Sequence, residues 1–275
     1  MTNNNKYGII KKITELSYEA DMVMCVDIGN TDITLGGFCG REPSFVARVS
    51  TYPMLTVDEY AAKLLGVLSL YGVEKSEVSG AIISSVVPPL NSIIKSAIKL
   101  IHGVNALTVG PGIKTGVNIH CDTPSSVGSD LICACVAAQK LYGGPAIIVD
   151  MDTATKMTVI DGKGAFVGVS ILPGVLMGLN SLSSETAQLP MVSLDAPASV
   201  VAKNTADCMR SGVIYGHASM VDGMIDRINS EIGEQLPIYV TGAQAKVIIP
   251  YCNHEMLLDD NLLLKGLNII YGKNT

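Results

Sequence analysis

"AIIVDMDTATKMTVID", residues 146–161, repeats the pattern of "VMCVDIGNTDITLGG", residues 23–37. Each stretch has an apolar strand, an aspartate, a tight polar turn and a second strand rich in β-branched residues. Asp27 and Asp150 occupy the same place in the two stretches. A strand followed by Asp is also a common way to enter a turn, but the matching hairpin context favours an internal repeat. The repeat predicts two similar halves that face each other across a cleft.

Strand-like and helix-like segments alternate along the rest of the chain, which is typical of an α/β fold with mixed sheets flanked by helices. The predicted organisation is an N-terminal extension, residues 1–21, an N-terminal domain, residues 22–120, and a C-terminal domain, residues 121–275. The sequence predicts helices at residues 56–70, 91–101, 128–142, 174–184, 206–231 and 261–271.

Composition excludes several classes of protein. The net charge is −6 and no basic cluster is longer than Lys11-Lys12, so we expect no nucleic-acid partner. No apolar stretch approaches the roughly 18 residues that a membrane helix needs. The seven cysteines form no CxxC pair and indicate reduced thiols in a cytoplasmic protein. Only 16% of the residues are charged, below the roughly 25% of ordinary domains, which favours a surface partly covered by a second copy or by a second domain.

The first hairpin has features of a phosphate-binding loop. Gly29 lets the backbone turn tightly and approach a ligand closely, and the amides and hydroxyls around Thr31 and Thr34 could cradle phosphate oxygens. Asp27 then lies where a phosphate-bound magnesium ion needs a carboxylate. An ordinary hairpin turn explains the same residues, and the sequence leaves both interpretations open.

The second hairpin adds hydroxyls and a cation to its acid. Thr153 and Thr155 alternate, so in a strand they point to one side, and Lys156 can neutralise a phosphate. Phosphoryl transfer depends mainly on positioning and on charge stabilisation. The two hairpins together therefore predict a site for the terminal phosphates of a nucleotide and their cations.

Gly128-Ser129-Asp130 precedes an apolar helix and has two possible roles. A Ser or Asp at a helix start is a good N-cap. Alternatively, Asp130 is the general base that takes the proton of an attacking alcohol. The spacing by itself favours the cap.

Seven motifs occur in the order and with the spacing seen in type III pantothenate kinases, and the resemblance covers residues 23–272. The motifs are "DIGNT" (27–31), "SSVVPPL" (84–90), "VGSD" (127–130), "VDMDTAT" (149–155), "TAQLP" (186–190), "KNT" (203–205) and "YVTGA" (239–243). The resemblance implies two ribonuclease H-like domains around a nucleotide cleft, the fold of the acetate kinase, sugar kinase, heat-shock chaperone and actin superfamily. It also implies transfer of the ATP γ-phosphate to pantothenate, the first step of coenzyme A synthesis, by a cytoplasmic homodimer that needs Mg²⁺ and K⁺ or NH₄⁺.

The resemblance further implies a role for each matching residue. Asp130 becomes the general base, Asp150 a ligand of the monovalent cation, and Asp27 a neighbour of magnesium. ATP binding is implied for Asp27, Ile28, Gly29, Asn30, Thr31, Asp32, Ile33, Thr34 and Thr153, and acceptor binding for Gly128, Ser129, Asp130, Leu131 and Thr205.

Several residues depart from the family pattern. Leu131 and Cys121 replace the arginine and the tyrosine that contact pantothenate, and Ala243 replaces a glycine near the adenosine side. Asp152 replaces a glycine and Lys156 a threonine within one motif. Because an acid and a base appear together, we hypothesise that the Lys156 ammonium takes the place of the monovalent cation. Asp152 would then pair with Lys156 or help to hold magnesium.

Three functions therefore stay open at the level of sequence. They are a pantothenate kinase with a remodelled acceptor site, a kinase for a different small alcohol, and a non-catalytic or regulatory paralogue. Retention of the three acids Asp27, Asp130 and Asp150 favours the two enzymes. Leu131, Cys121 and Asp152 favour the second and third interpretations.

Overall fold

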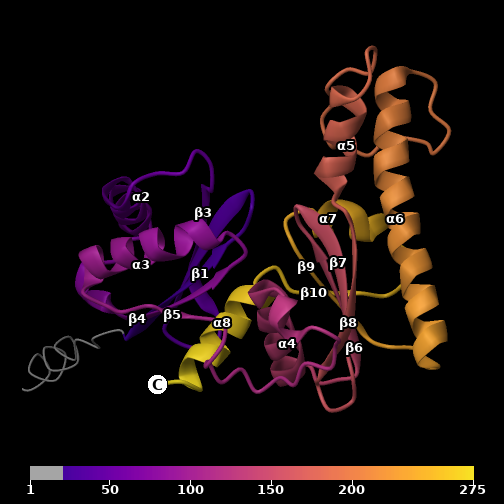
Figure 1. The fold of residues 1–275 in the computed structure, drawn as a ribbon. Helices are drawn as coiled ribbons and strands as arrows, with labels where there is room; N and C mark the ends of the chain where they lie inside the picture. Colours follow the sequence, from indigo (N-terminus) through magenta and orange to yellow (C-terminus); the bar gives the residue numbers. More distant parts are fainter. Residues whose placement is uncertain (1–20) are drawn as a thin grey trace, which may run out of the picture.

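The computed structural model describes residues 21–275, which form two five-stranded sheets with the same topology (Figure 1). The first sheet has the order β3-β2-β1-β4-β5 and the second β10-β9-β6-β7-β8. In each, three strands form an antiparallel meander, and two further strands add in parallel. The strands are β1 (Met22–Ile28), β2 (Asp32–Phe38), β3 (Pro43–Ser50), β4 (Val78–Ser85), β5 (Leu107–Thr108), β6 (Ala146–Met151), β7 (Ala154–Ile160), β8 (Phe166–Pro173), β9 (Ile238–Thr241) and β10 (Leu257–Leu258).

The internal repeat is confirmed at the level of residue pairs. β1 corresponds to β6, and β2 to β7. Asp27 lies opposite Thr34 across the first hairpin, and Asp150 lies opposite Lys156 across the second. The predicted α/β architecture is therefore present as two similar halves.

The helices arrange these sheets in layers. Helices α2 and α3 cover the outer face of the first sheet, and α6 covers the outer face of the second. Between the sheets lie α4 and α8, which pack against each other and bury one continuous core. The helices are α2 (Val57–Leu70), α3 (Pro88–His102), α4 (Ser129–Leu141), α5 (Val175–Ser184), α6 (Thr205–Ile232), α7 (Ala245–Ile248) and α8 (Leu262–Gly272), with 3₁₀ turns η1 (Lys75–Glu77), η2 (Pro124–Ser126) and η3 (Ile249–Tyr251).

The two inner helices connect the halves of the chain. α4 follows the first sheet and contacts both β4 of that sheet and β6 and β7 of the second, and α8 follows the second sheet but contacts β1, β2 and β4 of the first. The predicted domain boundary between residues 120 and 121 stays a prediction. Most of the predicted extension, residues 1–20 of 1–21, lies outside the described residues. In the part that is described, no helix has the length and apolar character of a membrane span.

The six predicted helices are confirmed, and one of them starts earlier than expected. The helix expected from Asn91 begins at Pro88, because proline is tolerated in the first helical turn, where its missing N–H has no partner to lose. The sequence interpretation omitted β3 and the short elements α7 and β10. Strand β3 carries Arg48, which lines the cavity between the sheets.

Helix α8 packs closely on α4 at Gly266, which faces the backbone of Cys133. A Cβ at Gly266 would collide with the backbone of Cys133, which cannot move away as a flexible side chain can. We expect Gly266→Ala to lower the melting temperature by several degrees, because overpacking costs about 1–3 kcal/mol. Gly272→Ala, at the end of the same helix and with no atom within 4 Å of the added Cβ, is the matched control. Equal melting temperatures for both variants would contradict this account of the packing.

Candidate active site

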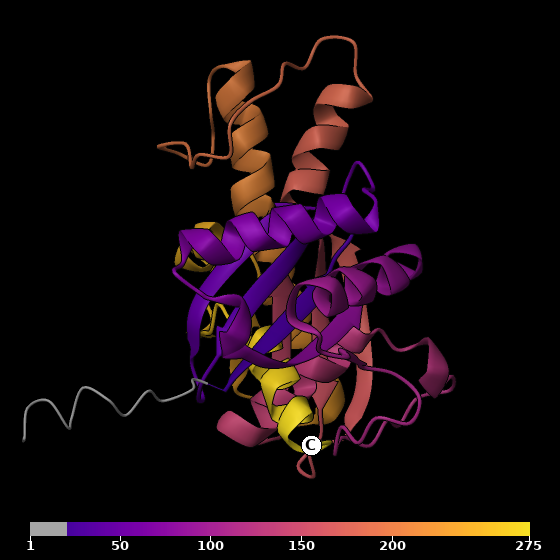
Figure 2. The same cartoon turned by 90° about the vertical axis from the view of Figure 1, so that its left-hand side faces the viewer.

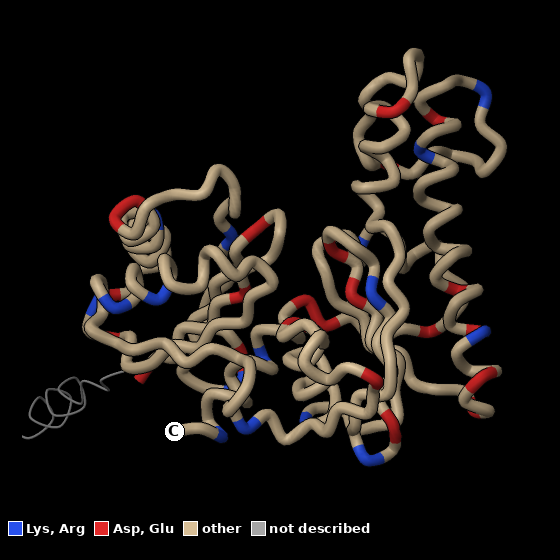
Figure 3. Tube along the Cα trace, viewed as in Figure 1, with Lys and Arg blue, Asp and Glu red and all other residues tan. Residues whose placement is uncertain are grey.

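The two hairpins line one cavity of about 750 Å³ between the sheets. Acidic stretches of the chain gather in this region, beside a basic one on the second sheet (Figure 3). The lining residues that matter below are Asp27, Gly29, Asn30, Thr34, Arg48, Gly128, Asp130, Leu131, Asp150, Asp152, Thr153, Lys156, Ile171 and Thr241.

A polar row crosses the inner face of the first sheet at the edge of the core. Residues at opposite positions on neighbouring strands point to the same face of a sheet and form a row across it. One row on the inner face of the first sheet is apolar and faces the core; its members are Ile82, Cys25, Gly36 and Val46. Two residues further along each strand, the next row on the same face is polar, with the members Ser84, Asp27, Thr34 and Arg48. The face therefore changes from core to ligand-binding character where the sheet leaves α8.

The second sheet carries the equivalent row. Tyr239 and Ile148 belong to the core. The next row on this face is Thr241, Asp150, Lys156 and Ile171. Position by position, Lys156 is thus the counterpart of Thr34, and Ile171 is the counterpart of Arg48.

Lys156 joins acids from two different elements. Its Nζ lies 2.6 Å from Asp130 Oδ2, at the start of α4, and 2.8 Å from Asp150 Oδ2 on β6. All three side chains are less than 20% exposed, so water screens these ion pairs only partly. The structure thereby brings together Asp130 and Asp150, which are 20 positions apart, through a single ammonium group.

The hypothesis that Asp152 pairs with Lys156 is wrong. Asp152 is exposed and forms no ion pair with any described residue, because it lies in the turn beyond the strand register that joins Asp150 to Lys156. Its carboxylate still lines the cavity. A ligand in the cleft can therefore reach it.

Asp130 does not cap α4. The N-cap residue is Gly128, and no side chain accepts a hydrogen bond at this helix start. Ser129 instead ties the helix start to β4, because its Oγ lies 3.0 Å from Ser84 Oγ and accepts a hydrogen bond from Ser85 N at 3.0 Å. Fixed in this way, the first turn of α4 directs Asp130 into the cleft. The interpretation of Asp130 as a helix cap is therefore wrong, and its carboxylate is part of the polar site instead.

The charges of this cluster shift the ionisation of its members. Burial, followed by the negative charge of Asp130, raises the pKa of Asp27 to about 7. Burial lowers the pKa of Lys156, but the charges of Asp150 and Asp130 outweigh it, so the net pKa is raised and the ammonium stays charged. Asp27 is therefore partly protonated at neutral pH, and a bound cation would favour its ionised form.

The hairpin tips meet across the cleft, but the alternating threonines do not both face it. Thr31 Oγ1 lies 2.8 Å from Thr153 Oγ1. Thr155 is fully buried instead, with its Oγ1 2.9 Å from His217 Nε2. The expectation that Thr155 contributes to the phosphate site is thus wrong: strand β7 begins at Ala154, and its alternation turns Lys156 toward the cleft and Thr155 away from it.

Other predicted site residues are distributed unevenly. Ile28 and Ile33 are fully buried in the core under α2 and α3, so only their backbone atoms can contact ATP. Leu131 is buried in the core between the sheets and only its edge reaches the cavity. Thr205 begins α6 and is not among the described residues that line the cavity.

Several lining residues were missed by the sequence interpretation, among them Arg48 and Gly242. Arg48 lies on β3, the strand that was not predicted. Gly242, which follows β9, has φ of 101°, and a Cβ there would meet the Met151 backbone at 2.5 Å. This glycine stands inside the "YVTGA" motif, so that motif was the signal for a close backbone approach at the base of the cleft.

Comparisons with known proteins agree with this geometry. The sequence matches the family profile of type III pantothenate kinase over residues 23–227. The type III pantothenate kinase of Moorella thermoacetica is 39% identical over 254 residues, which cover 92% of this chain and 100% of that protein. The corresponding protein of Brevibacillus brevis is 40% identical over 253 residues, covering 92% and 99%.

Solved structures support the fold. A protein described as a Baf family transcriptional activator from Campylobacter jejuni aligns with a TM-score of 0.57 at 18% identity, covering 91% of this chain and 98% of that chain. The inorganic polyphosphate/ATP-glucomannokinase of an Arthrobacter strain aligns with a TM-score of 0.50 at 14% identity, covering 92% and 99%. The predicted fold, two ribonuclease H-like halves around a cleft, is confirmed. Sequence identity over nearly its whole length shows that the chain belongs to the type III pantothenate kinase family.

Proposed function

We propose that this protein transfers the γ-phosphate of ATP to the hydroxyl group of pantothenate. The observation that carries the proposal is the convergence of Asp27, Asp130 and Asp150 on one cleft, with Lys156 between two of them. Relatives named type III pantothenate kinase favour this activity over a regulatory role. A kinase for a different small alcohol is the second candidate, because Leu131 offers no charge to a carboxylate.

On the nucleotide side, the hairpin tips are the proposed phosphate contacts. Gly29 and Asn30 line the cavity, and the hydroxyls of Thr31 and Thr153 hydrogen-bond to each other at the hairpin tips. Phosphate oxygens accept hydrogen bonds from such groups. We infer that bound ATP separates the two threonines and takes over both hydroxyls.

The donor set fits magnesium only together with the phosphates. No cluster of three His, Cys, Asp or Glu side chains within residues 21–275 forms a complete metal site. Magnesium is usually held by one or two carboxylates plus substrate phosphates, and Asp27 and Asp152, both on the cavity wall, can supply these oxygens. When bound, the ion neutralises charge on the phosphates.

On the acceptor side, Asp130 is the proposed general base. Lys156 contacts Oδ2, and no described residue hydrogen-bonds to Oδ1. Oδ1 can therefore take the hydroxyl proton while the alcohol oxygen forms its bond to the γ-phosphorus and ADP leaves. Gly128 leaves room for this carboxylate, because a Cβ at position 128 would collide with Oδ1.

A separate monovalent cation does not fit at Asp150. The carboxylate of Asp150 is already paired with the Lys156 ammonium at 2.8 Å. We therefore propose that Lys156 supplies the fixed positive charge, as hypothesised from the sequence. The ammonium also holds the general base in place, because the same nitrogen contacts Asp130.

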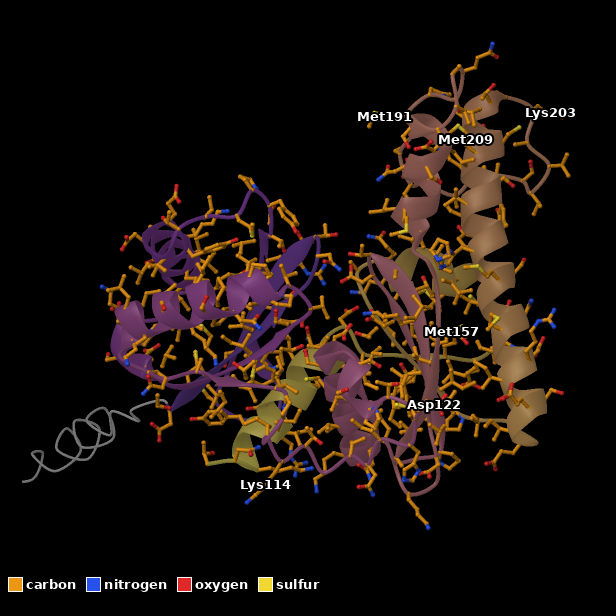
Figure 4. The ribbon with its side chains drawn as sticks, in the orientation of Figure 1. Lys114, Asp122, Met157, Met191, Lys203 and Met209 are labelled. Carbon is orange, nitrogen blue, oxygen red and sulfur yellow. The ribbon has the colours of Figure 1, made fainter. Side chains whose placement is uncertain are left out.

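We also propose that the protein acts as a homodimer in the cytoplasm. Helix α5 and the N-terminal part of α6 project as an arm beyond the second sheet (Figure 2), and Met191 and Lys203 lie near its tip (Figure 4). Large apolar side chains are exposed on this arm, which is typical of an interaction surface; they are Leu176, Met177, Met191, Val200 and Val201.

The test of the proposed activity is direct detection of the product. We expect purified protein with ATP, Mg²⁺ and pantothenate to form phosphopantothenate, identified by mass spectrometry. ATP binding without this product would favour the second candidate, an alcohol that lacks a carboxylate. Absence of both product and ATP binding would overturn the kinase proposal.

A further inference from the structure

Arg48 lies on the ligand-facing side of the first sheet, on edge strand β3. It is directly opposite Thr34, which in turn is opposite Asp27. Val46, two residues earlier on the same face, packs against the core, so the alternation of the strand directs Arg48 into the cavity that Asp27 also lines. Arg48 is exposed, and its side chain belongs to the wall of the same cleft.

The charge balance of the cleft leaves this guanidinium without a partner. Among the described residues that line the cavity, six are aspartates and two are basic, Arg48 and Lys156. The Lys156 ammonium is shared by two of the aspartates. Arg48, in contrast, forms no ion pair or side-chain hydrogen bond with residues 21–275. An arginine on a cavity wall with no partner among the described residues is an available site for an oxyanion.

The position of Arg48 distinguishes between the two oxyanions that a substrate can offer. Ser84, at the opposite end of the polar row, contacts Ser129 at the start of α4, beside the proposed base. Arg48 is two strands beyond Asp27, or about 10 Å at a strand spacing of about 4.8 Å. It thus lies on the side of the β1–β2 hairpin away from the acceptor. A phosphate chain held by that hairpin is within reach of a long arginine side chain, whereas an acceptor carboxylate beside Asp130 lies on the far side of it.

We propose that Arg48 binds the terminal phosphate of the nucleotide through its guanidinium N–H groups. The inference rests on the proposed function, since it assigns one more contact in the same site. The repeat supports a role specific to one half, because the corresponding position on the second sheet is Ile171, which cannot bind an anion. The β1–β2 hairpin and the Arg48 guanidinium of the first sheet thus hold the nucleotide. Lys156 of the second sheet neutralises Asp130 and Asp150.

The experiment compares nucleotides that differ by one phosphate. Binding of ATP, ADP and adenosine, each with Mg²⁺, is measured by calorimetry for the full chain and for Arg48→Gln. We expect Arg48→Gln to weaken ATP about 10- to 100-fold, because a hydrogen-bonded charged group is lost, and to change ADP and adenosine less than about twofold. Arg48→Lys keeps the charge without the planar fork and is expected to recover part of the ATP affinity.

Arg41→Gln is the matched control, because Arg41 is exposed in the turn before the same strand and does not line the cavity. Circular dichroism and melting temperature establish that each variant is folded. Unchanged ATP affinity in folded Arg48→Gln would overturn the assignment and leave the kinase proposal intact. A rise confined to the KM for pantothenate would also overturn it, in favour of the acceptor carboxylate. If the unmodified chain binds no ATP, both proposals fail.

Discussion

Asp130→Asn is expected to lower kcat by about 10²- to 10⁴-fold, the usual contribution of a positioned general base, while ATP affinity stays unchanged. Asparagine has nearly the same shape as aspartate but cannot accept the hydroxyl proton. Lys156 keeps its ion pair with Asp150 in this variant, so the cleft retains its main interaction. The measurements are phosphopantothenate formation and calorimetric ATP binding on the same preparation.

A matched control separates catalysis from helix stability. Asp130 lies in the first turn of α4, where an acid also stabilises the helix dipole. Asp58 lies in the first turn of α2, exposed and outside the cleft. Asp58→Asn should therefore reproduce any dipole effect on the melting temperature without affecting kcat. If Asp130→Asn retained more than half of the activity, the base would have to be another group.

Lys156→Thr should make the enzyme dependent on an added monovalent cation. The unmodified chain carries its own ammonium between Asp130 and Asp150, so we expect equal activity in potassium and in tetramethylammonium salts. Threonine restores the family residue and leaves the two carboxylates without a partner. In tetramethylammonium, activity is expected to fall by about 100-fold or more, since losing about 3 kcal/mol of charge stabilisation is worth that factor. Potassium or ammonium should restore part of it.

Lys163→Thr is the matched control for Lys156→Thr. Lys163→Thr removes a lysine from the exposed turn between β7 and β8, and should leave both activity and cation response unchanged. Strict potassium dependence of the unmodified chain would refute the internal-cation proposal. Loss of activity in Lys156→Thr that no cation restores would instead assign the ammonium a direct role toward the phosphate.

The Lys156 prediction depends on a difference between the two repeated hairpins. The two hairpins present an acid at equivalent positions, but the residue opposite the acid differs: Thr34 on the first sheet and Lys156 on the second. A threonine leaves Asp27 to meet cations that arrive with a ligand. A lysine fixes the charge beside Asp150 before any ligand arrives. In the first half, the charge of Asp27 is therefore balanced only when a nucleotide and its cation bind. In the second half, the charge of Asp150 is already balanced by Lys156.

Local patterns were sufficient to predict most elements and the general location of the site. The β1–β2 and β6–β7 hairpins followed from alternation and turn residues, and the capping box of α2 from Thr56 and Glu59. Strand β3 was missed because "PSFVARVS" begins with proline and its longest apolar run, residues 45–47, has only three residues. Missing that strand also concealed Arg48, because a residue can be assigned to a cleft only when its strand is known.

The sequence by itself determined the α/β class, the repeated hairpins, the three acids and the family, because these depend on local periodicity and on the order of motifs along one chain. Only the tertiary structure decided which charges meet. Lys156 pairs with Asp130 and Asp150 and not with its near neighbour Asp152, and Thr155 turns away to His217. The reason is physical: strand register and the packing of α4 between two sheets set distances in space, and separation along the chain does not encode those distances.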